Sequence, residues 1–225
     1  MIWCDTKVMF EPWCGDEYKS GIEGRRVLIL GESHYHNCDN DPPCREAETE
    51  TDRELRHRNL TREVVEWWKD NPHPSPLSYR VPELFGIEKP KFWNKVVFYN
   101  YVQAFVGCAA RVRPTEEMWA DEGNAKEFQV VLDCFEPDRI LVLGKKLWTN
   151  LPSSPALLEE SPREERGLLV SNNVGSYNDV DRFCYWYVAH SGKSALAMPI
   201  MHPSAPRFEL AKWKRPVADW LSFGK

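Results

Sequence analysis

The sequence predicts an α/β protein, a three-layer α/β/α arrangement with a central, mostly parallel four-stranded sheet. Short runs of branched apolar residues predict buried strands, and helical patterns lie between them. Strands that alternate with helices form parallel sheets covered on both faces. A chain of 225 residues is long enough to bury such a core, so we expect one domain over residues 1–225.

The strands are expected at residues 25–30, 95–100, 137–143 and 194–201. Gly31 follows the first strand and Gly144 the third, and both glycines are expected to end their strands. The second strand ends in the polar residue Asn100. Residues 183–189 and the turn at 190–193 predict an antiparallel hairpin partner for the fourth strand.

Helices are predicted between these strands and after the last one. Thr115 is a suitable N-cap for a helix over residues 116–135, whose first turn carries acids that the helix dipole favours. Residues 145–151 predict a short helix, and residues 208–221 predict an amphipathic one. The tryptophans of this last helix fall at helical spacing, so we expect them in the core.

Residues 37–91 interrupt the alternation of strands and helices. This stretch is highly charged, then helical in pattern near residues 61–68, then rich in proline. We therefore expect a helical and proline-rich insertion after the first main strand. A solvated insert is the default expectation, and a lid or wall of a ligand site is the alternative.

Composition restricts the location and partners of the protein. The net charge of −5 argues against a surface covered in basic charge, although it is compatible with a local basic groove. No apolar run approaches the ~20 residues that span a bilayer, and no secretory signal is visible. The seven cysteines form no C-x-x-C pair, which predicts free thiols. We expect a cytoplasmic monomer without membrane contact.

Polar groups follow four of the predicted elements at the edge where parallel strands end. They are the segment 32–35 (Glu-Ser-His-Tyr), Asn100, the lysines after Gly144, and the His-Pro-Ser sequence at 202–204. Ligands of open α/β sheets bind at this carboxyl edge. These side chains are suited to reading a heteroaromatic base and to stabilising negative charge on it.

Four segments, in this order along the chain, resemble the uracil-DNA glycosylase superfamily. VLILGESHYH resembles the strand and water-activating motif, written GQDPYH in the best-known branch and GEAPG in a thermophilic branch. KVVFYNYVQ resembles the strand that carries the base-reading asparagine. PDRILVLGKKLW resembles the third strand and its turn, and PIMHPSAPRF resembles the terminal HPS motif. The resemblance covers the core from about residue 27 onward, without the insertion.

The resemblance implies an enzyme of DNA repair that binds a flipped uracil or related deaminated base and hydrolyses its N-glycosidic bond. Asn100 would read the base, Tyr35 would exclude the 5-methyl group of thymine, and His34 would belong to the same base-binding wall. His202 would donate a hydrogen bond to the base oxygen as the glycosidic bond breaks.

The resemblance also implies contacts to DNA. Ser204 would bind a phosphate, and Arg207 and Phe208 occupy the region of the family's DNA-penetrating wedge. The thermophilic branch holds an iron–sulfur cluster through cysteines that begin with C-x-x-C. Cys4 and Cys14 are too far apart for that pattern, so we expect no cluster and no other cofactor.

The first motif departs from the family at its catalytic position. Ser33 stands where GQDPYH has its water-positioning aspartate, and serine is a poor base near neutral pH. Glu32, one position earlier as in the GEAPG branch, could orient the water instead. The expected catalytic residues are therefore His202, Glu32 and Ser33, with weak activity as one outcome.

A second HPS string occurs at residues 73–78, which read HPSPLS. This string follows a helical pattern rather than a strand, and it precedes the strand that ends in Asn100. The family motif must close the last strand of the sheet. We therefore assign the role to His202 and not to His73.

Two other functions stay open. A non-catalytic module of the same fold could bind nucleic acid or a nucleobase, which the missing aspartate and the acidic net charge favour. Ser33 after the first strand is also similar to the GDS block of SGNH-type serine hydrolases. Those enzymes orient their histidine with an acid three residues earlier, where this chain has Pro199.

Two further sets of residues carry weaker expectations. His34, His36, Cys38 and Cys44 are metal-ligating types, but their spacing fits no standard site, so no metal is expected. The basic residues at 111, 113, 145 and 146 are expected to be solvated, unless they share a face with His202.

Overall fold

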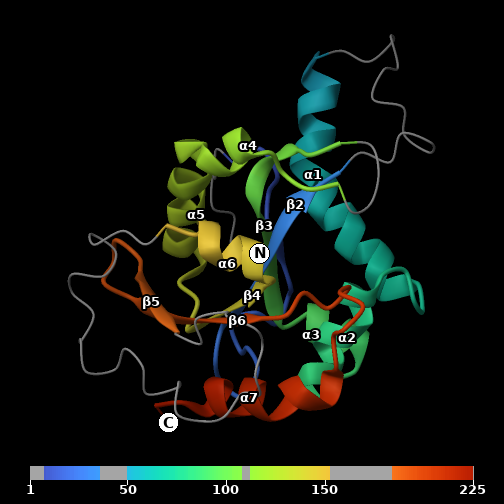
Figure 1. Ribbon diagram of the computed structural model, residues 1–225, viewed down its shortest axis with the longest axis vertical. Helices are drawn as coiled ribbons and strands as arrows, with labels where there is room; N and C mark the ends of the chain where they lie inside the picture. Colours follow the sequence, from blue (N-terminus) through green and yellow to red (C-terminus); the bar gives the residue numbers. More distant parts are fainter. Residues whose placement is uncertain (1–7, 36–49, 108–111, 153–183, 225) are drawn as a thin grey trace.

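The computed structural model describes residues 8–35, 50–107, 112–152 and 184–224, with the backbone alone for residues 50–56. Within these ranges, six strands form one sheet in the order β1-β3-β2-β4-β6-β5 (Figure 1). They are β1 Trp13–Cys14, β2 Val27–His34, β3 Val96–Phe105, β4 Arg139–Leu143, β5 Tyr185–Val188 and β6 Ser194–Ile200. The neighbours among β3, β2, β4 and β6 are parallel, and β1 and β5 pair antiparallel at the two edges. The mixed α/β class and the mostly parallel sheet are confirmed, but the sheet has six strands rather than four.

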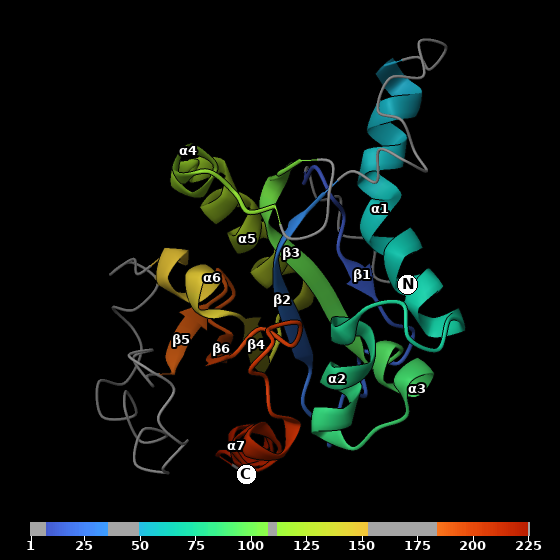
Figure 2. The same cartoon turned by 45° about the vertical axis from the view of Figure 1, so that its right-hand side comes forward.

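Helices pack on both faces of the sheet. The described helices are α1 Glu50–Asp70, α2 Pro76–Phe85, α3 Lys89–Trp93, α4 Glu116–Ala120, α5 Glu122–Phe135, α6 Lys145–Asn150 and α7 Leu210–Ser222. Val27 and Ile29 of β2 face a buried cluster that includes side chains of α1, α2, α3 and α7. Leu28 and Leu30 face a second cluster with α4, α5 and α6. Figure 2 shows α1, α2 and α3 on one side of the strands and α4, α5 and α6 on the other.

Two strands are longer than predicted. β2 continues through Gly31 to His34, with Gly31 paired opposite Asn100 and an irregularity between Ser33 and His34. β3 likewise continues past Asn100 to Phe105. The prediction that Gly31 ends its strand is wrong, because the pairing of β2 with β3 persists through the glycine.

The helix predicted over residues 116–135 is two helices, α4 and α5. Thr115 caps the first as predicted, since its side chain accepts a hydrogen bond from the Met118 N–H. Asp121 interrupts the helical path and accepts from the Gly123 N–H, so it acts as the N-cap of α5. The helices α6 and α7, the buried tryptophans of α7 and the hairpin of β5 with β6 confirm the other predictions.

The described part of the insertion is not a solvated excursion, so the default expectation is wrong. Val65 and Trp68 of α1, and Leu77 and Val81 of α2, are buried in the same cluster as β2. Within each helix these residues are three or four positions apart, which makes an apolar stripe on one face. The insertion therefore supplies much of the helical layer on that side of the sheet.

The HPSPLS string forms the start of α2. Ser75 is the N-cap and accepts a hydrogen bond from the Ser78 N–H, and Pro76 is the first helical residue. Both choices are favoured at helix starts. His73 is exposed and packs edge-on against Tyr79. The string is thus a helix start, as the choice of His202 over His73 requires.

The described residues bear on two further predictions, free thiols and the absence of a membrane span. Cys14 and Cys184 are free thiols, whereas Cys134 is disulfide-bonded. The prediction of free thiols is therefore wrong for Cys134. None of the helices in the described ranges has both the length and the hydropathy that crossing a membrane requires.

Candidate functional site

A buried group of hydrogen-bonded side chains joins β2, β3 and α1. We call it the amide cluster; its members are Asn100, His34 and Thr61 of α1. The Nε2 atom of His34 lies 3.1 Å from Asn100 Nδ2 and 3.0 Å from Thr61 Oγ1. Burial lowers the pKa of His34 to about 3, so the imidazole is neutral at pH 7. The contacts satisfy polar groups that would otherwise be costly to bury.

Gly31 makes the position of Asn100 possible. A Cβ atom at Gly31 would lie 2.1 Å from Asn100 Oδ1, which is closer than any real side chain could approach. The parallel register places the two residues opposite each other. A glycine inside a strand is explained here by this close approach, rather than by a turn.

A second group of side chains is linked by one ion pair and by electrostatic interactions; we call it the charged cluster, and its members are Glu32, Arg113, Lys146 and His202. Glu32 Oε2 lies 3.3 Å from Arg113 Nη1. Burial raises the pKa of the Glu32 carboxyl, and the positive charges of Arg113 and Lys146 partly oppose that rise. The Arg113 side chain is 66% exposed, so the ion pair with Glu32 is a weak constraint on either side chain.

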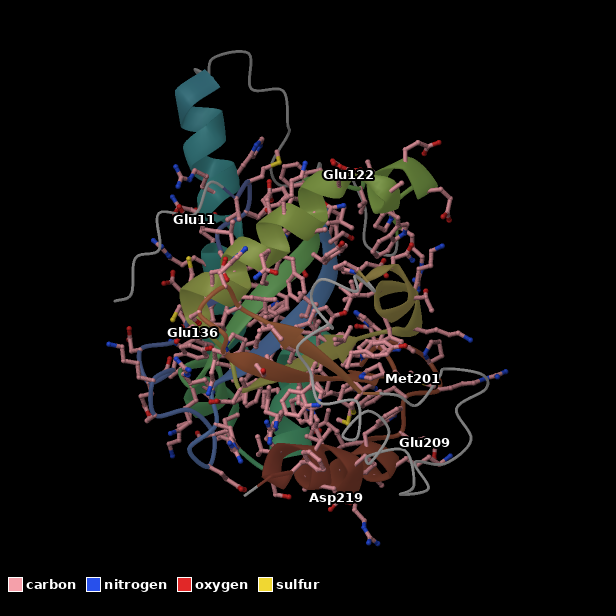
Figure 3. The ribbon with its side chains drawn as sticks, turned by 90° about the vertical axis from the view of Figure 1, so that its left-hand side faces the viewer. Glu11, Glu122, Glu136, Met201, Glu209 and Asp219 are labelled. Atoms are coloured by element: carbon pink, nitrogen blue, oxygen red, sulfur yellow. The ribbon has the colours of Figure 1, made fainter. Side chains whose placement is uncertain are left out.

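His202 lies in the loop between β6 and α7, which runs between the labelled residues Met201 and Glu209 in Figure 3. Its Nδ1 accepts a hydrogen bond of 3.1 Å from the Ser204 backbone N–H. Burial and, to a smaller extent, the charge of Arg113 lower its pKa to about 4. The ring is therefore neutral at pH 7, and because Nδ1 is an acceptor, the proton is on Nε2. His202 thus offers one N–H donor at a defined atom.

Arg80 of α2 holds the loop that carries His202. Its Nη1 donates a hydrogen bond of 2.5 Å to the carbonyl oxygen of Pro203. Its guanidinium carbon also lies 5.7 Å from the centre of the Phe208 ring, a cation–π distance. The insertion therefore contacts both parts of the candidate site, through Thr61 at one and Arg80 at the other.

The two clusters are separated across the sheet. Two strands, β2 and β4, lie between β3, which carries Asn100, and β6, which precedes His202. Three strand spacings correspond to about 14 Å between backbones. No hydrogen bond joins Asn100 to His202 among the described residues. Both side chains could therefore act on one ligand only if it lay across the ends of β2 and β4.

Several predicted site residues have a different environment from the one expected. Phe208 is buried among core side chains, so in this structure it is a packing residue and not an exposed wedge. Arg207 and the Ser204 side chain are exposed, and the Ser204 N–H orients His202. Tyr35 is 48% exposed at the end of the described segment. His34 contacts Asn100 from the protein interior, so it supports the amide instead of forming part of an outer wall.

In the part of the chain that the structure describes, Ser33 has no hydrogen bond to a histidine, as a serine nucleophile needs. It is half-buried in β2, paired in register with Val102. Among the described residues it makes no hydrogen bond to His202. The Nδ1 atom of His202 accepts from a backbone N–H, and no acid in the described ranges bonds to the ring. This arrangement does not favour the serine hydrolase alternative.

Sequence reasoning missed Thr61 and Arg80 and left Arg113 open. Arg113 acts electrostatically on both Glu32 and His202, so it meets the condition under which a basic residue there gains functional weight. Thr61 precedes Val65 and Trp68 by four and seven positions, which placed it on the buried face of its helix. That spacing was the one available signal for its inward orientation.

The described residues contain no group of three side chains suited to hold a metal ion. Three of the four residues considered for a metal site, His36, Cys38 and Cys44, lie outside the described ranges. Neither a protein-family model nor a curated protein matches the chain. The functional argument therefore depends on the geometry of the two clusters.

Proposed function

We propose that the protein binds uracil or a related deaminated base flipped out of DNA and hydrolyses its N-glycosidic bond. In this proposal the sheet with its two helical layers is a uracil-DNA glycosylase-like fold. The base lies across the ends of β2 and β4, with Asn100 on one side and His202 on the other. Flipping costs a few kcal/mol of stacking energy, which contacts at both ends of the base must offset.

The observation that carries the proposal is the state of His202. A neutral ring with its proton on Nε2 is a hydrogen-bond donor that does not need to lose or gain charge before the reaction. As the bond between the sugar and the base breaks, negative charge develops on the base oxygens, and a fixed donor stabilises it. The loop contact from Arg80 holds this donor in place.

Glu32 is the residue best placed to act on the attacking water. Burial raises its pKa, which makes the carboxylate a better proton acceptor than an exposed glutamate. A carboxylate also favours the cation-like sugar that forms as a glycosidic bond breaks. Asn100 supplies the donor and acceptor pair that a base edge requires.

The test is release of uracil from single- and double-stranded oligonucleotides that contain one uracil. We expect His202→Ala to lower the release rate about 10²- to 10³-fold, as loss of a charge-stabilising donor does. We expect Glu32→Gln to lower it about 10²- to 10⁴-fold, as loss of a general base does. His73→Ala is the matched control, because this exposed histidine begins the other HPS string. An unchanged rate in His202→Ala, or a large loss in His73→Ala, would refute the assignment.

A second candidate function is base binding without cleavage. The observation that favours it is the positive charge of Arg113 and Lys146, which opposes the rise in the pKa of Glu32 and so weakens the carboxylate as a base. In that case the wild-type protein retains uracil-containing DNA but releases no base. His202→Ala would then weaken binding, and Glu32→Gln would leave binding unchanged or strengthen it.

A further inference from the structure

The amide cluster contains one atom with two polar neighbours. His34 Nε2 lies within hydrogen-bond distance of both Asn100 Nδ2 and Thr61 Oγ1. The Phe10 ring packs against the imidazole at 4.6 Å between centres, and all four residues are buried. A neutral ring either accepts or donates at Nε2, because this atom carries either a lone pair or a proton.

The neighbours of Nε2 respond differently to these two states. A threonine hydroxyl can donate or accept simply by rotating its proton. The amide of Asn100 has separate ends, so it must turn its nitrogen toward a lone pair or its oxygen toward a proton. The state of His34 therefore decides which end of Asn100 faces away from it.

We propose that His34 accepts at Nε2 and thereby fixes Asn100 with its amide nitrogen toward the imidazole. The second N–H and the Oδ1 atom then form a donor–acceptor edge that is available to a ligand. This edge complements an N–H beside a carbonyl, the lactam group of uracil and hypoxanthine. Cytosine and adenine present a ring nitrogen beside an amino group, which is the reverse pattern.

His34 is thus a positioning residue that determines selectivity for deaminated bases. This inference rests on the proposed function for its substrate, but the orientation of the amide is a property of the free protein. Gly31 leaves space for Oδ1 of Asn100. Thr61 contacts the His34 ring and so helps to keep it in position against the amide.

The first test is a nitrogen NMR spectrum of the full chain, in which the two ring nitrogens of each histidine report where the proton is. His34 is expected to carry its proton on Nδ1, whereas His202 carries it on Nε2 because its Nδ1 accepts from Ser204. The spectrum of His34→Gln assigns the His34 signals by their loss. A proton on His34 Nε2 would overturn the proposal, whether or not the protein has activity.

The second test compares binding of oligonucleotides that differ only in uracil or cytosine at one position. His34→Leu removes the acceptor, and we expect the preference for uracil to fall at least fivefold. His34→Gln retains an acceptor oxygen and should restore most of the preference. A change in overall affinity with an unchanged preference, or no rescue by glutamine, would show a purely structural role and refute the inference.

The two proposals fail in different ways. If wild-type protein releases uracil while His34 carries its proton on Nε2, the proposed function holds and the inference fails. If the proton is on Nδ1 but neither base is bound or released, the amide is oriented as inferred, and the proposed function and the base selectivity both fail. Thermal unfolding of each variant identifies any loss caused by misfolding, and the wild-type spectrum decides the orientation even if His34→Leu does not fold.

Discussion

Replacing Gly31 with alanine tests the close approach of β2 and β3 directly. The added methyl group would lie 2.1 Å from Asn100 Oδ1, and 3.1 and 3.2 Å from two carbons of the Phe98 ring. The amide must move by about 1 Å or more to reach an ordinary contact distance. That movement strains the packing, which costs about 1–3 kcal/mol, and disrupts the hydrogen bond with His34. A buried donor without a partner costs about 1–3 kcal/mol more.

The expected loss for Gly31→Ala is therefore about 2–4 kcal/mol, since the two effects overlap. For a chain of this size it corresponds to a fall in Tm of about 4–16 °C. Gly24→Ala is a control, because a Cβ at Gly24 meets nothing within 4 Å. That variant should be destabilised only by the left-handed backbone, which costs an alanine about 1–2 kcal/mol.

A double-mutant cycle with Asn100→Ala gives the decisive measurement. Asn100→Ala removes the amide with which the methyl group added by Gly31→Ala would clash. The double variant should therefore be little less stable than Asn100→Ala alone. We expect a coupling free energy of about 1–3 kcal/mol from urea unfolding of the four proteins. Additive effects, within about 0.5 kcal/mol, would refute the view that Gly31 is a glycine because of Asn100.

Three other predictions concern the charged cluster and its support. Arg113→Gln should raise the pKa of both Glu32 and His202, because the positive charge of Arg113 favours the deprotonated form of each. NMR titration measures both pKa values, and shifts in opposite directions would contradict this prediction. The pKa of His202 is about 4 in the folded chain and about 6.5 when unfolded, so the unfolded state binds the proton first as pH falls. The free energy of unfolding should therefore decrease from pH 6.5 toward pH 4, by at most about 1.4 kcal/mol per pH unit from this group, and His202→Asn should reduce that slope. Arg80→Leu removes the hold on Pro203, and we expect uracil release to slow about 10- to 100-fold with DNA affinity nearly unchanged; an unaltered rate would show that the loop needs no support.

The order and type of the main elements could be predicted from local patterns, but their ends could not. Val27 to Leu30 are branched or aliphatic and buried, as a central strand requires. The residue that follows them, Gly31, resembles a strand terminator in sequence. A glycine is needed at this position because the side chain of Asn100 on the neighbouring strand leaves no room for a Cβ, and no local pattern indicates that contact. Asp121 similarly divides a continuous helical pattern because it caps the second half.

Local patterns predicted the site residues that belong to strands, but not those that belong to helices of the insertion. Glu32, Asn100 and His202 come at or just after the ends of the apolar runs that predict strands, and the ends of parallel strands lie along one edge of a sheet. Thr61 and Arg80 reach the site from helices of the insertion, across sequence distances that periodicity does not address. Phe208 was expected to be exposed as a DNA wedge. It is buried instead, with the Arg80 guanidinium of α2 over its ring, a contact that local sequence does not indicate.

The two contacts from the insertion link ligand binding to the stability of α1 and α2. Thr61 and Arg80 hold the groups that would meet a ligand at opposite ends, so local opening of either helix releases one of them. A ligand that requires both groups in place must therefore favour the closed helices by mass action. Amide hydrogen exchange in α1 and α2 should slow when such a ligand is added, even though neither helix supplies a principal contact to it. Protection of these helices can thus serve as a binding signal when candidate ligands are screened without any assay of catalysis.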